Sequence, residues 1–166
     1  YDKATAAGIY EKALAAAIVN LKNVPSLSHR LSTIIHAATR HCELGGIDLI
    51  VPIPLSTRRR LERGFNQAES IAKAFSRSTG IPIDAHSLTR KMHTPIHRIG
   101  MDQKARELTV KNAFEVVRPK LIDGKNILLV DDVLTSGATA SSCAKILKKN
   151  GAGKINVFTL ARAVMH

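Results

Sequence analysis

The segment Ile127–Thr139 has the sequence ILLVDDVLTSGAT, and it decides the fold that we expect for this chain. Its first four residues are all apolar, which is typical of a strand buried on both faces of a parallel sheet. A helical pattern starts at Ser136 and continues to Asn150, where Gly151 is a suitable C-terminal cap. A buried strand that leads directly into a helix is the unit from which α/β domains are built.

The segments around this one show the same alternation. Ile47–Leu55 is a second apolar run and predicts another buried strand. Asn66–Thr79 predicts a helix, because Asn66 is a good N-cap and Glu69 completes a capping-box pattern. Shorter strands are expected at Ile81–Leu88, Ala113–Val117 and Ile155–Ala161. This order predicts an α/β domain with a mainly parallel sheet flanked by helices.

The first 45 residues have a different pattern. Residues 4–21 are rich in Ala, Ile and Leu near helical spacing, which predicts an amphipathic helix, and Ser28–Thr39 predicts a second one. A chain of 166 residues fits one domain. We therefore expect a single domain with an N-terminal helical segment, 1–45, and an α/β core, 46–166.

The composition points to an anionic partner. Lys and Arg number 25 against 13 Asp and Glu, so the formal charge is +12. Nucleic acid, an acidic membrane surface or a phosphorylated small molecule would fit this charge, and a solvated basic surface is an equally good alternative. Cys42 and Cys143 form no CxxC pair, which argues against a zinc site. No membrane-spanning segment or signal peptide is visible, so we expect a reducing, cytoplasmic setting.

The loop after the strand at Ile127 carries the chemistry. Ligands of parallel sheets bind beyond the carboxyl ends of the strands, where Asp131 and Asp132 stand. The amides at the start of the next helix attract a phosphate, and Gly137 lets the backbone approach it. The carboxylates would repel a phosphate but suit vicinal hydroxyls, such as those of ribose, or a hydrated Mg²⁺. A sugar phosphate satisfies both halves; the alternative is a purely structural turn with a capping Asp.

Two further segments are strongly basic. Ser56–Gly64 is predicted to be a loop that faces an anion, although its run of arginines also suits a nucleic-acid patch. Arg90–Lys111 is polar and weakly periodic, and we expect a long mobile excursion there.

The loop LLVDDVLTSGAT closely resembles the signature of type I phosphoribosyltransferases, which bind 5-phosphoribosyl-1-pyrophosphate (PRPP). The segments VPIPLSTRRRLERGFNQAESIA (Val51–Ala72) and KARELTVKNAFEV (Lys104–Val116) resemble the ComF, or competence protein F-like, family. The resemblance extends over residues 47–161. It implies a type I phosphoribosyltransferase-like fold, with a five-stranded parallel core and a small hood, and PRPP with Mg²⁺ as the ligand.

The resemblance also implies roles for individual residues. Asp131 and Asp132 would hold the ribose hydroxyls and, with Arg106 in a closing loop at 90–106, are the catalytic candidates. The 5′-phosphate would be held by Thr135, Ser136, Gly137, Ala138 and Thr139. The pyrophosphate would be held by Ser56, Arg58, Arg59, Arg60 and Arg63. The protein itself would supply no direct metal ligand, because Mg²⁺ would arrive with PRPP.

The sequence departs from the family in two places. The Cys-rich zinc ribbon with which ComF proteins usually begin is missing, and Ile96 or His97 stands where many members have Gln. A glutaminase nucleophile is also missing, since Tyr1 occupies the first position, so we expect no glutamine hydrolysis.

The resemblance implies a Mg²⁺-dependent phosphoribosyltransferase whose acceptor is unknown. The first alternative is a non-catalytic PRPP- or nucleotide-binding protein of DNA uptake. The second is a DNA-binding competence factor in which the loop is a relic. Beside PRPP, the resemblance leaves room for DNA or the competence machinery as partners, and for a homodimer.

Overall fold

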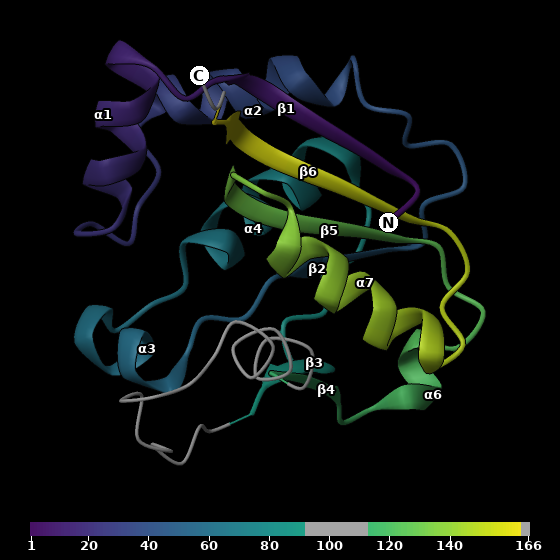
Figure 1. Ribbon diagram of the computed structural model, residues 1–166. Helices are drawn as coiled ribbons and strands as arrows, with labels where there is room; N and C mark the ends of the chain where they lie inside the picture. The colour runs from purple at the N-terminus through teal and green to yellow at the C-terminus, as the bar shows by residue number, and fades with distance from the viewer. Residues whose placement is uncertain (92–112, 164–166) are drawn as a thin grey trace.

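Four parallel strands form the central sheet in the order β1-β6-β5-β2 (Figure 1). They are β1 (Lys3–Ile9), β6 (Ile155–Arg162), β5 (Ile127–Leu134) and β2 (Leu49–Pro52). The computed structural model describes residues 1–91 and 113–163. The excursion predicted at Arg90–Lys111 lies outside the described residues from 92 on, as does Arg106. The predicted parallel α/β sheet is confirmed.

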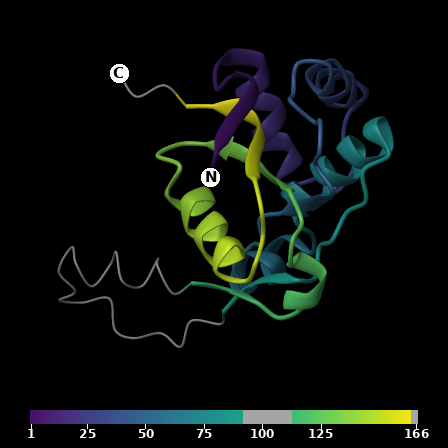
Figure 2. The ribbon, with the colours of Figure 1, turned by 90° about the vertical axis from the view of Figure 1, so that its right-hand side faces the viewer.

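Helices cover both faces of the sheet. Figure 2 shows α7 (Ala138–Lys149) on one side, and α4 (Gln67–Thr79) and α2 (His29–Thr39) on the other. Successive side chains of β5 alternate between the two cores: Leu128 packs with the α4 side and Leu129 with the α7 side. No helix among the described residues is long and apolar enough to cross a membrane.

The prediction of a helix at residues 4–21 is wrong in its first half. Lys3–Ile9 is an edge strand that pairs in parallel with β6, and only α1 (Lys12–Leu21) is helical. The small residues of KATAAGI have little apolar surface with which to anchor a helix. Backbone pairing with the buried β6 therefore outweighs the local helix propensity of Ala.

The loop predicted at Ser56–Gly64 is a short helix, α3 (Thr57–Arg63). Ser56 caps it by accepting a hydrogen bond from the Arg59 amide, and Gly64 ends it with a left-handed backbone. The helix at Asn66–Thr79 is confirmed with Asn66 as its N-cap. The capping box is not formed, because the Glu69 side chain pairs with Lys73.

The strand predicted at Ile81–Leu88 is reduced to a single bridge between Ile83 and Ile50. The resemblance implied five parallel strands, whereas the parallel sheet within the described residues has four. Two short strands, β3 (Leu88–Arg90) and β4 (Phe114–Val116), form a separate antiparallel pair. A short helix, α6 (Pro119–Ile122), leads from β4 to β5.

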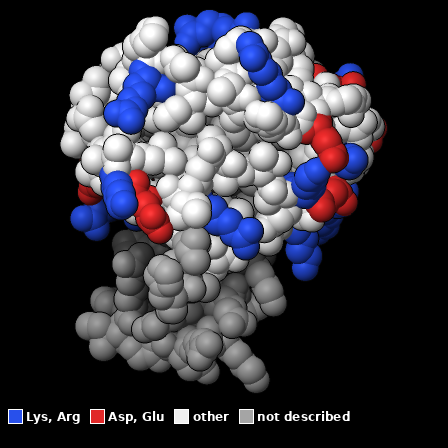
Figure 3. Space-filling model, turned by 90° about the horizontal axis from the view of Figure 1, so that it is seen from above, with Lys and Arg blue, Asp and Glu red and all other residues white. Residues whose placement is uncertain are grey.

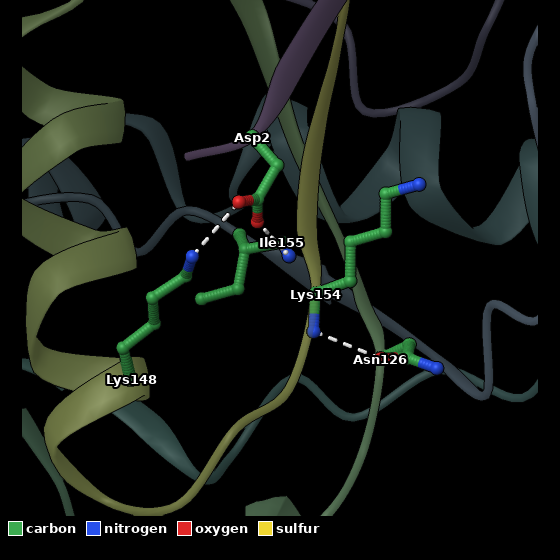
Figure 4. A network of polar contacts seen from close by, with 5 residues as sticks. All are labelled: Asp2, Asn126, Lys148, Lys154 and Ile155. Atoms are coloured by element: carbon green, nitrogen blue, oxygen red, sulfur yellow. Dashed lines mark hydrogen bonds and ion pairs between the residues drawn. The ribbon is translucent and has the colours of Figure 1, made fainter.

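A polar network ties the N-terminal strand to the sheet (Figure 4). The Asp2 amide donates to the Ile155 carbonyl over 2.7 Å, and the Ile155 amide donates to Asp2 Oδ2 over 2.7 Å. Lys148 Nζ on α7 lies 2.9 Å from Asp2 Oδ1. The hydrogen bond from Ile155 and the contact with Lys148 lower the pKa of Asp2. Asp2 thus fixes the register of β1 against β6 and also ties β1 to α7.

Replacing Asp2 with Asn should destabilise the protein at neutral pH by about 1 kcal/mol, because an exposed ion pair and one charge-assisted hydrogen bond are lost. The pKa of Asp2 is lower in the folded state, so its stabilisation is present above the unfolded value of about 4 and disappears as the pH falls through the folded pKa. Urea unfolding at pH 7 and pH 3 would measure this.

Lys148→Gln is the matched control, because it removes the ion pair and leaves the bond from Ile155. Its loss of stability should be smaller than that of Asp2→Asn. An equal difference between wild type and Asp2→Asn at both pH values would contradict the assignment.

Candidate functional site

Asp131 and Asp132 lie on the part of β5 that extends beyond the end of β2. Strand β2 ends at Pro52, opposite Val130, whereas β5 continues to Leu134 along β6. The two carboxylates therefore lie on a strand that has a partner on one side only. This opening at the carboxyl edge of the sheet is where a ligand of an α/β domain is expected.

Backbone amides hold the two carboxylates in place. Asp131 Oδ1 accepts from the Asp132 amide over 2.9 Å, and Asp132 Oδ1 accepts from the Val133 amide over 2.7 Å. Burial, and then the charge of Asp132, raise the pKa of Asp131 to about 7. Within the described residues, no other side chain donates a hydrogen bond to either carboxylate. Hydroxyl donors or a cation would relieve this repulsion, and carboxylate oxygens suit Mg²⁺.

The segment 135–139 forms the turn into α7. Its members are exposed except Gly137, which is buried in a left-handed conformation with φ of 75°. A Cβ atom at Gly137 would lie 2.8 Å from the Tyr1 hydroxyl. Ser136 Oγ accepts from the Ala138 amide over 3.4 Å, and the other hydroxyls of the turn are those of Thr135 and Thr139. Exposed hydroxyls and amides at a helix N-terminus can hold a phosphate.

Helix α3 separates the predicted pyrophosphate-binding arginines onto different faces. Arg58 pairs with Glu62 at 2.7 Å. Arg63 donates to the buried Gln67 over 3.0 Å. Arg59 instead lies close enough to Arg90 for its charge to help lower the pKa of that guanidinium, after the larger effect of burial.

The RGFNQ motif has a structural role as well. Asn66 Nδ2 donates to the Ile53 carbonyl over 3.0 Å, so the start of α4 is fixed to the chain just past β2. Because Arg63 in turn contacts Gln67, the position of α3 is set from the same motif. The sequence pattern alone did not indicate this bracing role.

Arg90 is a residue that the sequence placed only in a mobile loop. It lies at the end of β3, paired with Phe114, and its guanidinium carbon is 5.3 Å from the Phe114 ring centroid. Among the described residues neither Arg59 nor Arg90 has a carboxylate partner. Two cations held near each other in this way favour an anion between them.

Cys143 lies close enough to both Arg90 and Asp131 for their charges to affect its pKa. Burial raises the pKa of this thiol, the nearby charge of Asp131 raises it further, and Arg90 opposes both effects. Asp131 and Arg90 therefore both act on Cys143, on the α7 side of the sheet. The candidate site combines a carboxylate pair, the exposed turn at the start of α7 and a pair of arginines.

Asp131→Asn should stabilise the ligand-free protein at pH 8 by about 1–3 kcal/mol, because a half-buried carboxylate no longer has to ionise beside Asp132. The folded pKa is raised, so the native state holds a proton between about pH 4 and pH 7 that the unfolded chain has lost. Wild-type stability should therefore rise, relative to the variant, as the pH falls through 7. A difference in urea midpoints that does not vary with pH would refute this.

Gly137→Ala should destabilise the protein more than Gly80→Ala. Both glycines have a left-handed backbone, which costs an alanine about 1–2 kcal/mol. A Cβ atom at Gly80 meets open space, whereas at Gly137 it meets the Tyr1 hydroxyl, which should add about 1 kcal/mol. Equal losses in urea unfolding would show that Tyr1 does not confine the turn.

Several curated proteins are similar to this chain in sequence, although the sequence matches no protein-family model. The chain is 33% identical to competence protein F of Haemophilus influenzae over 98% of this chain and 74% of that protein. It is 34% identical to the DNA utilization protein YhgH of Escherichia coli over 70% of this chain. It is 32% identical to competence protein ComFC of Bacillus subtilis over 69% of this chain. It spans 50% of YhgH and 45% of ComFC.

Solved structures share the fold. A glutamine PRPP amidotransferase from Bacillus subtilis, complexed with ADP and GMP, has a TM-score of 0.52 at 22% identity, over 78% of this chain and 25% of that chain. A hypothetical protein from Neisseria gonorrhoeae with bound ppGpp has a TM-score of 0.54 at 18% identity, over 99% of this chain and 74% of that chain. Together with the identity to competence protein F, the sheet and its loop show that the chain belongs to the ComF family, with a type I phosphoribosyltransferase fold.

Proposed function

We propose that this chain binds PRPP with Mg²⁺ and transfers its phosphoribosyl group to an acceptor. The observation that carries the proposal is the meeting of three features at one edge of the sheet. These are the carboxylate pair, the exposed turn at the start of α7, and Arg59 and Arg90, which have no carboxylate partner in the part of the chain that the structure describes. Few ligands other than a ribose with phosphate groups on opposite sides would use all three.

In this proposal each feature has one task. Asp131 and Asp132 accept the ribose hydroxyls through the oxygens that the backbone leaves free. The amides and hydroxyls of residues 135–139 hold the 5′-phosphate at the helix N-terminus. Arg59 and Arg90 face the pyrophosphate, with Ser56 fixing the start of α3. Arg58 and Arg63 contribute positive potential, because their own contacts are with Glu62 and Gln67.

Transfer requires that the pyrophosphate departs and that positive charge on the ribose is stabilised. Bound Mg²⁺ would supply charge neutralisation for the leaving pyrophosphate. In this proposal Asp131 and Asp132 stabilise the positive charge that develops on the ribose, and Arg59 and Arg90 offset the charge of the departing group. Arg106 keeps its assignment as a catalytic candidate in the closing loop, and it lies outside the described residues.

Binding without turnover is the second candidate function. It is favoured by the names of the curated relatives, competence protein F and DNA utilization protein, which describe processes rather than a reaction. The gonococcal neighbour with bound ppGpp is compatible with it, since that ligand also presents phosphate groups on a ribose. Both candidate functions use the same site. In the non-catalytic one, DNA or the competence machinery would be the partner that responds to ligand binding.

Calorimetry with PRPP and Mg²⁺ tests the site. Asp131→Asn combined with Asp132→Asn should weaken binding at least tenfold, because charge-assisted hydrogen bonds to the ribose are lost. Arg59→Ala should weaken it about tenfold, whereas Arg58→Ala, on the same helix, should change it about twofold or less. Wild type that fails to bind millimolar PRPP would overturn the proposal, as would equal effects of the two arginine variants.

Pyrophosphate release distinguishes the two candidates. Wild type with PRPP, Mg²⁺ and purine, pyrimidine or nicotinate acceptors should release pyrophosphate with at least one of them. Binding in calorimetry without release for any acceptor would favour the non-catalytic candidate. Glutamine hydrolysis is expected to be absent in the same assays.

A further inference from the structure

A hollow of about 580 Å³ is lined by none of the residues proposed to hold the ribose or the 5′-phosphate, although Arg60, one of the predicted pyrophosphate-binding arginines, lines it. It runs along the outer surface of α4, between Asn66 and Arg77, and the segment Pro25–Leu27 and Ser32 on α2 form its other wall. Helix α4 packs on the face of the sheet that carries Leu128, whereas Cys143 packs on the opposite face. Asp131 and Asp132 are not among the residues that line the hollow.

We propose that this hollow binds a nucleoside diphosphate, independently of PRPP. The half-buried ring of Phe65 would take the base, and the basic side chains of α4 would take the phosphate groups. No role in the proposed transfer reaction requires this hollow.

The charge of the hollow favours an anion. Three cations line it, Arg60, Lys73 and Arg77, against the single carboxylate of Glu69. Glu69 is held by Lys73 at 2.8 Å. Neither arginine has an ion pair within the described part of the chain. The guanidinium groups are therefore available for phosphate oxygens, which they bind with two parallel hydrogen bonds.

The other lining residues suit a nucleoside. Phe65 is one of four phenylalanines in the chain, and it lines a polar hollow although most of the core is aliphatic. An aromatic ring stacks on any base. Ser26 and Ser32 place hydroxyls on the facing wall. Ser70 Oγ donates to the Pro25 carbonyl over 3.1 Å, which holds that wall against α4 before any ligand arrives.

The dimensions favour one nucleotide over a nucleic-acid strand. From Asn66 to Arg77 the helix rises about 16 Å, which matches the reach from a base to a second phosphate. The volume lies within the range of pockets for single small ligands. A strand would need a basic path of several nucleotides. On the face in Figure 3, above α1, α2 and β1, the Lys and Arg side chains lie around the rim and the centre is uncharged.

Calorimetry with ADP tests the proposal, with adenosine and inorganic pyrophosphate as the two halves of the probe. Wild type should bind ADP more tightly than either half. Arg77→Ala should weaken ADP binding about tenfold, because it removes one charge-assisted contact. Phe65→Leu should weaken it about fivefold or more, because stacking is lost. Arg40→Ala, an exposed arginine outside the hollow, is the matched control and should have no effect.

The Asp131→Asn, Asp132→Asn double variant separates the two sites, because it should keep ADP binding at the wild-type level. Loss of ADP binding in that variant, with Arg77→Ala unaffected, would place the nucleotide at the PRPP loop and overturn the proposal. Pyrophosphate binding as tight as that of ADP would also overturn it, since the base would then play no part. So would affinity for oligothymidylate that rises with length, or no heat with millimolar ADP.

Discussion

The site depends on the pairing of β5 with β6 beyond the point at which β2 ends. Residues Ile127 to Leu134 stay in register with Ile155 to Arg162, so the strand continues without interruption through two acidic residues. A strand buried among apolar neighbours normally ends before such residues, because an unpaired charge in a sheet is costly. Here the backbone pairing with β6 holds both carboxylates at the open edge, and the position of α7 and its turn follows from that strand.

The candidate site contains two unfavourable like-charge contacts, one between carboxylates and one between arginines. Burial, and then the charge of Asp132, raise the pKa of Asp131, and burial, and then the charge of Arg59, lower the pKa of Arg90. Unrelieved contacts of this kind gather at functional sites, and they are the physical ground for the proposed ligand. A ligand that relieved both would bring hydroxyls or a cation to one side and negative charge to the other. That requirement comes from the described side chains and is independent of any relative.

The elements predicted from sequence are those whose stability is local or whose burial is continuous. The strand at Ile127 and the helix capped by Asn66 carry their own apolar and capping patterns. Strand β1 does not, because its conformation is decided by pairing with a segment some 150 residues away. Helix α3 has no buried residue, so no apolar stripe could reveal it. The position of Arg90 depends on pairing with Phe114, which is distant in sequence, so the residues next to Arg90 could not predict it.

Helix α3 connects the two proposed sites. Arg59 lies close enough to Arg90 to help lower its pKa, after the larger effect of burial, and the next residue, Arg60, lines the hollow along α4. The helix contributes no buried side chain of its own and is held by its Ser56 cap and by the Arg63–Gln67 contact. A ligand that orders Arg60 therefore also orders the helix that presents Arg59. If both sites bind their ligands, linkage requires that each ligand change the affinity for the other by the same factor, and α3 is the element through which this coupling would act.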